Sequence, residues 1–463
     1  MTHAAHRKDT IAAVATPSGQ GGVGIIRLSG AASHAIAKRL FHASSDKFSD
    51  FKPYTLHHGQ LKDADGNVLD DVLTAYMPGP DSFTGEDVVE FNCHGGQAIL
   101  ASVLEECLNA GARLAQKGEF TLRAFLNGRM DLTQAEAVAE MIHAPTRAAA
   151  HMAQIKHSGL LGATIAELRT QLEGLRSQLC IAVDFPEEEL ECLSPEQLVT
   201  QSSQVRARMN ELLAAVERTK AWREGALVVL AGMVNAGKSS LMNALLGRDR
   251  AIVTDVPGTT RDYIEETLDL DGLRVRLADT AGMRESDDTV ELAGMTISRE
   301  LMEQADLVLF VVDNSATIAD ENVDACLTLD PGKTIAVMNK VDCIAAEPQP
   351  WKIFKRYMFE LVKVSAKTGK NLDKLTATMR ARLLAGQEQP DPDELVPNAR
   401  QAAALKQACT ELEAMETDAT GGVPYDLLGV RLETACSKLD AITGTISSDE
   451  VLNAIFDDFC IGK

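Results

Sequence analysis

The amino-acid sequence predicts three structural regions: an α+β N-terminal domain, a discontinuous α-helical domain, and an α/β domain inserted into that helical domain. Short apolar runs and glycine-rich turns fill the chain to about residue 128. In 129–224 and again in 387–463, apolar residues recur every three or four positions, as in helices. Between these two regions, in 225–386, short apolar runs alternate with helical segments. A chain of 463 residues is too long for one ordinary domain. From the changes of pattern we expect the regions 1–128, 129–224, 225–386 and 387–463.

The first region reads as α+β. Ile25, Ile26 and Leu28 form a strand-like run directly after the glycine cluster at 19–24. Further turn-like segments follow at 83–87 (FTGED) and 94–96 (HGG).

The helical region begins near Asp131 and carries one continuous apolar stripe. Its members step by three and four residues: Ile165, Leu168, Leu172, Leu175 and Leu179. Pro186 ends this helix, and Ser194-Pro195-Glu196-Gln197 predicts the start of the next, with a serine cap and a glutamine three residues later. The pattern favours two antiparallel core helices of a bundle over any chemistry in this stretch.

The inserted region alternates strands and helices, which is typical of a parallel sheet. The expected strands include 227–231, 307–312, 335–338 and 361–364, and Asp271-Gly272 predicts a hairpin turn with one antiparallel edge pair. A linker rich in Pro, Asp and Glu follows at 387–397. Helical periodicity then resumes with Leu405, Cys409, Leu412, Leu428, Leu432 and Leu439, so we infer that both helical regions form one domain.

Composition restricts the partners and the compartment. The net charge of −22 does not attract nucleic acid or anionic membrane over the whole surface, so any RNA contact needs a local basic patch. The nine cysteines form no Cys-x-x-Cys pair, which argues against a disulfide framework and a zinc site. We see no signal peptide and no apolar stretch of about 20 residues. A cytoplasmic protein is the expectation.

The segment from Gly232 to Ser239 fits the phosphate-loop pattern G-x-x-x-x-G-K-S. It follows an apolar strand and opens a helix, which is the context that the motif requires. Its glycines let backbone N–H groups surround a β-phosphate. Lys238 can neutralise phosphate oxygens, and Ser239 can offer its hydroxyl to magnesium.

Four further motifs follow in the order expected for a Ras-like GTPase. Asp279-Thr280-Ala281-Gly282 ends one strand and can approach magnesium and the γ-phosphate. Asn339-Lys340-Val341-Asp342 ends another, and its last carboxylate can accept two N–H groups from guanine. Ser365-Ala366-Lys367 ends the last strand, and Thr259-Thr260 can supply a second magnesium hydroxyl.

Together these motifs predict a GTP-binding set and two magnesium hydroxyls, Ser239 and Thr260. The GTP-binding set is Asn235, Ala236, Gly237, Lys238, Ser239, Ser240, Thr254, Asp255, Val256, Pro257, Gly258, Thr259, Thr260, Asp279, Thr280, Ala281, Gly282, Asn339, Lys340, Val341, Asp342, Ser365, Ala366 and Lys367.

Two departures from a Ras-like site affect hydrolysis. Met283 follows Asp-Thr-Ala-Gly, where a water-positioning glutamine is usual, so a carboxylate from the segment containing Glu285, Asp287, Asp288 and Glu291 must replace it. We find no arginine finger. The Asn235 amide oxygen is a fair ligand for a monovalent cation that can supply the same positive charge.

The chain ends in the tetrapeptide Cys460-Ile461-Gly462-Lys463. With this ending, and over nearly its whole length, the chain resembles the MnmE (TrmE) family of tRNA-modification GTPases, and the tetrapeptide is the most specific shared feature. Others are 21–25 (GGVGI), 83–87 (FTGED), 184–188 (DFPEE) and 258–262 (GTTRD). One departure is Val234, which stands where the family usually has proline and which should loosen the phosphate loop slightly without abolishing binding.

The resemblance implies a reaction and its partners. Members of this family act with the flavin (FAD) protein MnmG, also called GidA, and add an aminomethyl or carboxymethylaminomethyl group to carbon 5 of the wobble uridine of certain tRNAs. The N-terminal domain resembles folate-binding domains, which implies 5-formyl- or methylene-tetrahydrofolate as one-carbon donor. The family is homodimeric through these domains, and its GTPase domains meet across the dimer upon GTP hydrolysis.

The resemblance also implies site residues. Arg27, Glu90, Arg129 and Lys463 would line the folate pocket, and Arg129 stands where lysine is also seen. Potassium would bind Asn235, Thr254, Val256 and Thr259, and Glu291 would be the catalytic carboxylate. Cys460 is a second catalytic candidate because a thiol ionises close to neutral pH, especially beside Lys463.

The residues alone leave alternatives open. Without the resemblance, Arg27 reads as well as a surface arginine at a strand end, whereas Glu90 reads more readily as a solvated edge residue and Cys460 as a buried hydrophobe near Phe456 and Phe459. A GTPase that binds ribosomal RNA during ribosome assembly is the alternative function. Such proteins typically carry an RNA-binding module, and we find no basic, aromatic-rich segment of that kind.

Overall fold

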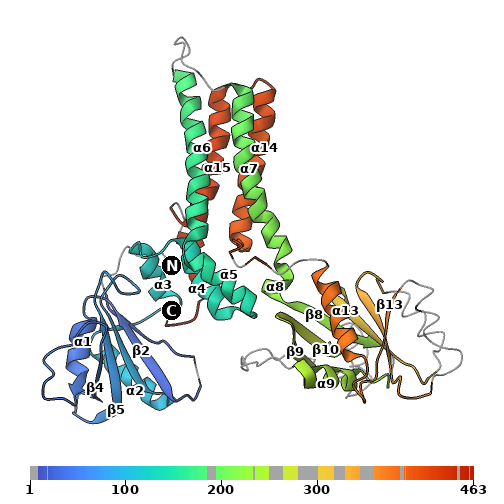
Figure 1. Cartoon of the computed structure of the whole chain (residues 1–463). Coiled ribbons are helices and arrows are strands. Elements are labelled where there is room, and N and C mark those ends of the chain that lie inside the picture. Colours follow the sequence, from blue (N-terminus) through green and yellow to red (C-terminus); the bar gives the residue numbers. More distant parts are fainter. Residues whose placement is uncertain are drawn as a thin grey trace, which may run out of the picture. The chain divides into compact units, whose positions relative to one another are not determined.

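The computed structural model describes residues 9–17, 19–184, 194–232, 235–249, 264–279, 301–316, 329–344, 354, 359–385, 390–391, 393–445, 449–457 and 459–462. The chain divides into two compact units, which are described separately. One unit contains residues 1–142, 153–213 and 397–463, and the other contains 143–152 and 214–396. Figure 1 shows the elements along the chain.

The N-terminal region forms a mixed sheet with the strand order β3-β4-β5-β6-β2-β1-β7. Helices α1 (Ser33–Leu40) and α2 (Gln97–Asn109) cover one face and enclose a core that includes Ile26, Leu28 and Phe91. This arrangement confirms the α+β expectation. The strands are β1 (Ile11–Val14), β2 (Val23–Ser29), β3 (Phe41–Ala43), β4 (Leu56–Lys62), β5 (Val68–Met77), β6 (Val88–His94) and β7 (Arg113–Leu114).

The other face of this sheet is covered in part by α3 (Glu119–Leu126). Phe120 from α3 packs with Ile11 and Ala13 of β1 in a small separate core. The last helix of the chain, α16 (Asp449–Asp457), packs against α3, and Phe456 and Phe459 share a buried cluster with Leu122 and Leu132. The C-terminal helix therefore packs on the N-terminal region, against the helix that covers this face of the sheet.

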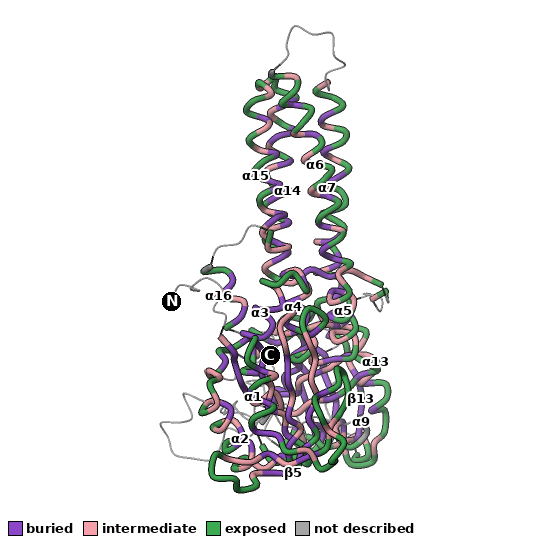
Figure 2. The backbone as a smooth tube through the Cα atoms, turned by 90° about the vertical axis from the view of Figure 1, so that its left-hand side faces the viewer, coloured by how far each residue is buried: buried purple, intermediate pink, exposed green. Residues whose placement is uncertain are grey.

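Four long helices form the bundle: α6 (Leu160–Asp184), α7 (Pro195–Arg218), α14 (Ala399–Thr420) and α15 (Tyr425–Thr443). Figure 2 shows buried positions along their facing sides. The apolar stripe predicted from Ile165 to Leu179 is buried, as are Leu405, Cys409, Leu412, Leu428, Leu432 and Leu439. At the start of α7, Gln197 N donates to Ser194 Oγ at 3.2 Å and Ser194 N donates to Gln197 Oε1 at 2.9 Å, which confirms the predicted capping box.

Polar contacts join the two halves of this domain. Arg206 of α7 donates to Glu416 of α14 at 2.9 Å, and Arg169 of α6 donates to Asp440 of α15 at 2.9 Å. The shorter helix α4 (Leu132–His143) carries Glu136, whose Oε1 accepts a hydrogen bond from Arg400 Nε at 2.6 Å. Residues more than 200 positions apart thus form one helical domain, as the separated periodic segments predict.

The second unit is built on a sheet with the strand order β13-β12-β11-β8-β10-β9. Its pairs are parallel except β9–β10, whose turn Asp271-Gly272 has φ angles of 51° and 88°, as the predicted hairpin requires. Helices α9 (Lys238–Asp249) and α13 (Leu372–Leu384) flank it. The strands are β8 (Ala226–Gly232), β9 (Ile264–Leu270), β10 (Leu273–Asp279), β11 (Leu307–Asp313), β12 (Thr334–Asn339) and β13 (Glu360–Lys363).

A short connector helix, α8 (Lys220–Glu224), is held firmly in this second unit. Trp222 is 2% exposed, and its carbonyl oxygen accepts the Thr146 hydroxyl at 2.7 Å, just before α5 (Arg147–His157). The Arg380 guanidinium lies 5.9 Å from the Trp222 ring centroid. This second unit, which we call the G domain, therefore includes short pieces of the flanking helical segments, namely 143–152 and 214–224.

Candidate functional site

The nucleotide-motif residues of the G domain gather at one edge of its sheet. The parallel register pairs Val311 with Gly232 and Asp313 with Asn339, so the carboxyl ends of β8, β11 and β12 coincide. β10 ends beside them at Asp279, which pairs with Leu230. The strands are almost entirely buried, and polar residues follow where each strand ends. This edge is where open parallel sheets bind ligands.

The phosphate loop is built for close approach of its backbone. Gly237 has φ of 91°, and a Cβ at that position would overlap the Asn339 side-chain amide. Lys238, the first residue of α9, is 8% exposed and donates to the Gly232 carbonyl at 3.1 Å, so it closes the loop around the space for a phosphate.

Ser239 and Asp279 meet at the expected metal position. The Ser239 hydroxyl donates to Asp279 Oδ2 at 2.8 Å, and Asp279 is 3% exposed. A hydroxyl beside a carboxylate at a helix N-terminus is the oxygen environment that magnesium prefers next to phosphates. The chemistry of these two residues therefore fits the ion.

Asn339 ties three motifs together. Its amide donates to the Ala236 carbonyl at 3.0 Å, and its Oδ1 accepts the Ala366 N–H at 3.0 Å. The side chain is almost fully buried. One residue thus holds the phosphate loop and the loop after β13 at a fixed separation.

Lys340 bridges the base motif and the phosphate loop. Its ammonium donates to the Asn235 carbonyl at 2.7 Å and to Asp313 Oδ2 at 2.6 Å. Burial raises the pKa of Asp313, but hydrogen bonds from Lys340 and Ser315 outweigh burial and leave that pKa below its usual range. Asp313 belongs to none of the sequence motifs, and its one signal in the sequence is that it is an acidic residue at the end of an apolar strand.

Asp342 is exposed at the rim of this edge. The Ser365 hydroxyl donates to Asp342 Oδ1 at 2.6 Å, and Ser365 Oγ in turn accepts the Thr368 N–H at 3.1 Å. The hydrogen bond from Ser365 is the main reason that the pKa of Asp342 is lowered. The carboxylate stays ionised as an acceptor, which is the form that guanine recognition needs.

The remaining nucleotide residues divide into two groups. Ser240 lies in α9, Val341 donates its N–H to the Val364 carbonyl at 3.2 Å, and Lys367 is exposed in the loop after β13. The other predicted nucleotide residues lie outside the described part of the chain: Thr254, Asp255, Val256, Pro257, Gly258, Thr259, Thr260, Thr280, Ala281, Gly282 and Glu291. The predicted folate residue Lys463 lies outside it as well.

A second candidate site lies on the N-terminal sheet. Arg27 and Glu90 are directly opposite each other on β2 and β6, and Arg27 Nε donates to Glu90 Oε1 at 2.7 Å. Arg27 Nη1 also donates to the Gly462 carbonyl at 3.0 Å, and the guanidinium lies 5.7 Å from the Phe120 ring centroid. The structure thus brings two of the expected folate residues together with the end of the chain.

The C-terminal tail is held beside β1. Lys117 and Ile461 form an antiparallel bridge, and Gly462, with φ of 93°, lies so close to β1 that a Cβ would overlap the Val14 carbonyl oxygen. Cys460 is exposed. The importance of Gly462 was not predicted from the residues, and only its place in the shared tetrapeptide pointed to it.

Arg129, the third of the expected folate residues, does not contact Arg27 or Glu90 in the described part of the chain. It is exposed, and its side chain packs beside Gly85 in the 83–87 turn. No hydrogen bond or ion pair joins it to Arg27 or Glu90 within the described part of the chain.

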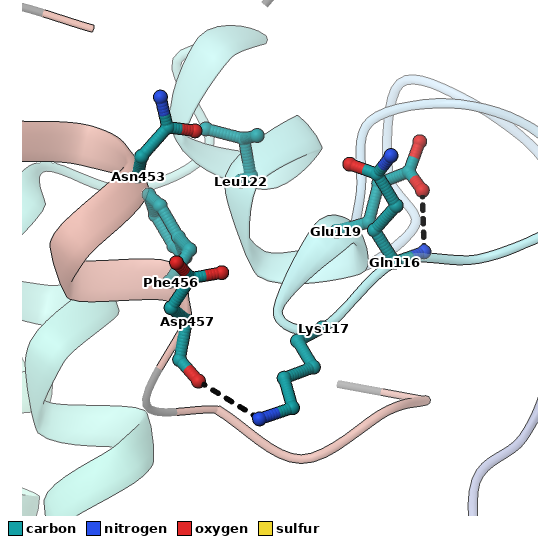
Figure 3. Close-up of a pocket in the computed structure, with 7 residues that line it drawn as sticks. All are labelled: Gln116, Lys117, Glu119, Leu122, Asn453, Phe456 and Asp457. Carbon is teal, nitrogen blue, oxygen red and sulfur yellow. Dashed lines mark hydrogen bonds between the residues drawn. The ribbon is translucent and has the colours of Figure 1, made fainter. Parts of the chain in front are cut away.

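A small pocket lies where α3 meets α16, as Figure 3 shows. Lys117 Nζ donates to the Asp457 carbonyl at 3.4 Å, and the Gln116 N–H donates to Glu119 Oε2 at 2.8 Å. Neither Arg27 nor Glu90 lines the pocket. These two hydrogen bonds close the turn before α3 and tie Lys117 to the end of α16, so they help to hold α16 in place.

Comparison with known proteins follows the same division of the chain. The family description "MnmE helical domain" matches residues 132–460, and "GTP-binding protein TrmE N-terminus" matches residues 10–129. A solved structure of Era in complex with MgGDPNP is 27% identical and covers 40% of this chain and 66% of that chain, with a TM-score of 0.29.

Several relatives match over almost their entire length. The tRNA modification GTPase MnmE of Nitratidesulfovibrio vulgaris is 54% identical over 457 residues, covering 98% of this chain and 99% of that protein. Those of Lawsonia intracellularis and Carboxydothermus hydrogenoformans are 46% and 41% identical, each covering 98% of this chain and 100% of the relative.

The fold and the nucleotide edge define a GTPase of the phosphate-loop class. More narrowly, the chain belongs to the MnmE family of tRNA modification GTPases. Membership of this family favours tRNA modification over the ribosome-assembly alternative. No helix in the described part of the chain is long and apolar enough to cross a membrane.

Proposed function

We propose that this protein hydrolyses GTP and, together with the FAD-dependent partner MnmG, modifies carbon 5 of the wobble uridine of certain tRNAs. The group added is an aminomethyl or carboxymethylaminomethyl group. The observation that carries the GTPase part is the position of Asn339, which joins the phosphate loop and the loop after β13. The tRNA part rests on family membership.

Guanine nucleotide binding would use the described edge in a definite way. Asp342 would accept the two guanine N–H donors, and the Ala366 N–H, which here donates to Asn339 Oδ1, would meet the guanine oxygen. Lys238 would leave the Gly232 carbonyl to contact phosphate oxygens. Ser239 would hold magnesium together with Thr260, with Asp279 acting through water.

Hydrolysis would depend on a monovalent cation and on a carboxylate from another segment. Potassium on Asn235, Thr254, Val256 and Thr259 would offset charge that develops on the β-phosphate oxygens. Asn235 lies in the phosphate loop with φ of 58°, and its backbone carbonyl oxygen already accepts Lys340 Nζ at 2.7 Å, so the side-chain amide oxygen is the atom that would bind the ion. Glu291 would orient the attacking water, and faster hydrolysis in potassium than in sodium is the expected signature.

The folate that carries the one-carbon unit would bind on the N-terminal sheet, beside the terminal tetrapeptide. Arg27, Glu90, Arg129 and Lys463 would hold 5-formyl- or methylene-tetrahydrofolate, which supplies the carbon that reaches the uridine. The contact of Arg27 with both Glu90 and Gly462 supports this assignment, since it brings the terminal tetrapeptide to the sheet. Cys460 is exposed in that tetrapeptide and can serve as acid, base or nucleophile. We also propose a homodimer, formed through the N-terminal domains.

The test is the Cys460→Ser variant in a reconstituted reaction with the flavoprotein partner and tRNA. GTP hydrolysis should stay within about twofold, because the tail lies in a different unit from the nucleotide edge. Modified uridine, measured by mass spectrometry of tRNA nucleosides, should fall strongly. Normal modification in the variant would show that Cys460 is only structural, and failure of the unaltered protein to modify tRNA would contradict the proposed function.

A further inference from the structure

The G domain contains a marked local excess of positive charge. Between residues 352 and 382 the sequence has nine basic and two acidic residues, although the whole chain has a net charge of −22. Six of these basic residues lie in the described part: Lys363, Lys367, Lys370, Lys374, Arg380 and Arg382. An acidic protein that acts on RNA needs such a region, because phosphates are repelled from most of its surface.

Four of these residues come from one compact segment, which we call the lysine surface: Lys363, Lys367, Lys370 and Lys374. The Ser365 N–H donates to the Lys370 carbonyl at 3.1 Å, which closes the turn between β13 and α13. Asn371 Nδ2 donates to the Lys363 carbonyl at 2.8 Å, so the end of β13 lies beside the start of α13. The four lysines are therefore close together, and all are exposed.

The packing of α13 fixes the direction of this surface. Leu372, Leu375 and Met379 are buried against the sheet, which leaves Lys374 on the solvent side. The two arginines later in the helix have other contacts. Arg382 pairs with Glu360 at 2.8 Å, and Arg380 lies over Trp222. Lys370 and Lys374, in contrast to the two arginines, have exposed side chains without a described partner.

In the described part of the chain, few acidic residues lie near the lysine surface. Asp342 accepts a hydrogen bond from Ser365 and its charge interacts with that of Lys367, and Glu360 is paired with Arg382. Asp373 is the one acidic residue within the segment from 363 to 374. Within the described part of the chain, the ammonium groups of Lys370 and Lys374 form no ion pair or hydrogen bond. Paired surface charges would be largely satisfied already, whereas these two keep their full capacity to attract an anion.

We propose that the lysine surface binds the sugar-phosphate backbone of the tRNA substrate. This inference rests on the proposed function in tRNA modification. Lysine ammonium groups suit phosphates as point charges without a required plane, and phosphate contacts position RNA without reading its sequence. A binding site for one small anion would instead converge on a buried polar group, and these lysines are spread along an exposed turn and helix.

The position of the surface links RNA to the nucleotide. Lys367 follows Ser365 and Ala366 directly, and those residues contact Asp342 and Asn339. RNA held on the lysine surface would therefore lie against the loop that touches guanine. Binding of tRNA and of GTP would then influence each other through that loop, with equal and reciprocal effects on affinity.

The experiment compares two double variants of the full chain. The test variant carries Lys370→Gln and Lys374→Gln, which are outside the residues assigned to GTP. The matched control carries Lys220→Gln and Lys406→Gln, two exposed lysines with the same change in charge. Binding of an unmodified tRNA transcript is measured at several potassium chloride concentrations, and GTP hydrolysis without tRNA is measured in parallel.

Loss of two phosphate contacts should reduce the slope of log K against log salt by about 1.4 to 1.8. The control should keep the slope of the unaltered protein, and GTP hydrolysis without tRNA should be unchanged in both. An unchanged slope in the test variant would overturn the inference while leaving the proposed function intact. If the unaltered protein bound no tRNA at any salt concentration, both would fall. Weakened binding of the flavoprotein partner with normal tRNA binding would show that the surface recognises protein instead.

Discussion

Two regions of the molecule bring distant residues together by different means. In the G domain, four buried strands end at one edge, and the polar residues that follow them meet because the sheet aligns the strand ends. On the N-terminal sheet, Arg27 contacts Gly462, which is 435 positions away, because α16 and its following tail pack against α3 and β1. The first arrangement follows from a repeated local pattern, and the second depends on one docked segment.

This difference matters for how each site responds to change. The nucleotide edge has several mutually supporting contacts: Asn339 to two loops, Lys340 to Asn235 and Asp313, and Ser365 to Asp342. Among its described residues, the tail makes fewer side-chain hydrogen bonds, and Phe456, Phe459 and the close approach of Gly462 help to hold it. Substitutions at the nucleotide edge should therefore alter specificity, and substitutions at the tail should release a whole segment.

The largest effect is expected for Asp342→Asn. An amide presents one acceptor and one donor, so it cannot accept two N–H groups from guanine but can pair with xanthine. Loss of hydrogen bonds to a charged group should weaken GTP binding on the order of 100-fold, equivalent to about 2.8 kcal/mol. Calorimetry with guanine and xanthine nucleotides measures this change.

Asp330→Asn is the matched control, because Asp330 is exposed in the turn before β12, at the opposite end of that strand from Asn339. It should leave both affinities unchanged. Equal GTP affinity in the Asp342 variant and the unaltered protein would remove Asp342 from base recognition.

The contrast between the regions also explains what the sequence could predict. The phosphate loop, the strand ends and the bundle stripes recur at short spacing, and local rules place each of them correctly. The hairpin at Asp271-Gly272 and the cap at Ser194 are equally local, and the structure has both. Contacts such as Arg27 with Gly462 have no local spacing, and only the family tetrapeptide suggested that the tail has a role.

Asp313 shows a second limit. It lies in neither of the motifs that it supports, yet its carboxylate holds Lys340, and Ser315 holds that carboxylate through Oδ1 at 2.6 Å. Supporting residues of this kind occur wherever a strand end faces a motif, and sequence patterns do not distinguish them from ordinary turn residues. Arg129, by contrast, matched the family pattern, but the described contacts place it beside Gly85 rather than Arg27.

A smaller effect, limited to the N-terminal site, is expected for Arg27→Lys. One ammonium group cannot reach Glu90 and the Gly462 carbonyl together while keeping a flat group over Phe120. Loss of one charge-assisted hydrogen bond costs about 1.5–3 kcal/mol, so tetrahydrofolate affinity should fall about tenfold to a hundredfold.

Fluorescence titration with 5-formyltetrahydrofolate tests this change, and GTP hydrolysis should be unaffected. Arg39→Lys, at an exposed position near the end of α1, provides the control and should bind normally. If Arg27→Lys bound the folate as tightly as the unaltered protein, the contact with Gly462 would serve only to hold the tail.

Gly462→Ala should produce a somewhat smaller loss by moving the tail. Alanine disfavours a φ of 93°, and its Cβ would overlap the Val14 carbonyl oxygen. Release of the tail should weaken folate binding on the order of tenfold, equivalent to about 1.4 kcal/mol. Gly422→Ala is a matched control, since that glycine also has positive φ, 76°, but has open space around it. Hydrogen exchange of residues 459–462 should increase in the first variant and stay constant in the second.

The smallest expected effect is a difference in pH response between the two regions. His94 Nδ1 lies 2.6 Å from Asp70 Oδ1 in the N-terminal domain, and this hydrogen bond, followed by the negative charge of Asp70, raises the pKa of His94. A raised pKa stabilises the fold fully below the unfolded value of about 6.5, and the stabilisation is lost as pH rises through the folded value. Asp342 behaves in the opposite way: its lowered pKa stabilises above about 3.9, and this contribution is lost only as pH falls through the folded value. Between pH 5.5 and 8.5, therefore, His94 should titrate and Asp342 should not.

The difference in thermal midpoint between the unaltered protein and His94→Gln should be larger at pH 5.5 than at pH 8.5. His58→Gln, at an exposed histidine without a side-chain hydrogen bond in the described part of the chain, is the matched control. An equal difference at both pH values would mean that His94 holds Asp70 as a neutral hydrogen-bond donor, and the two regions would then not differ in their response to pH.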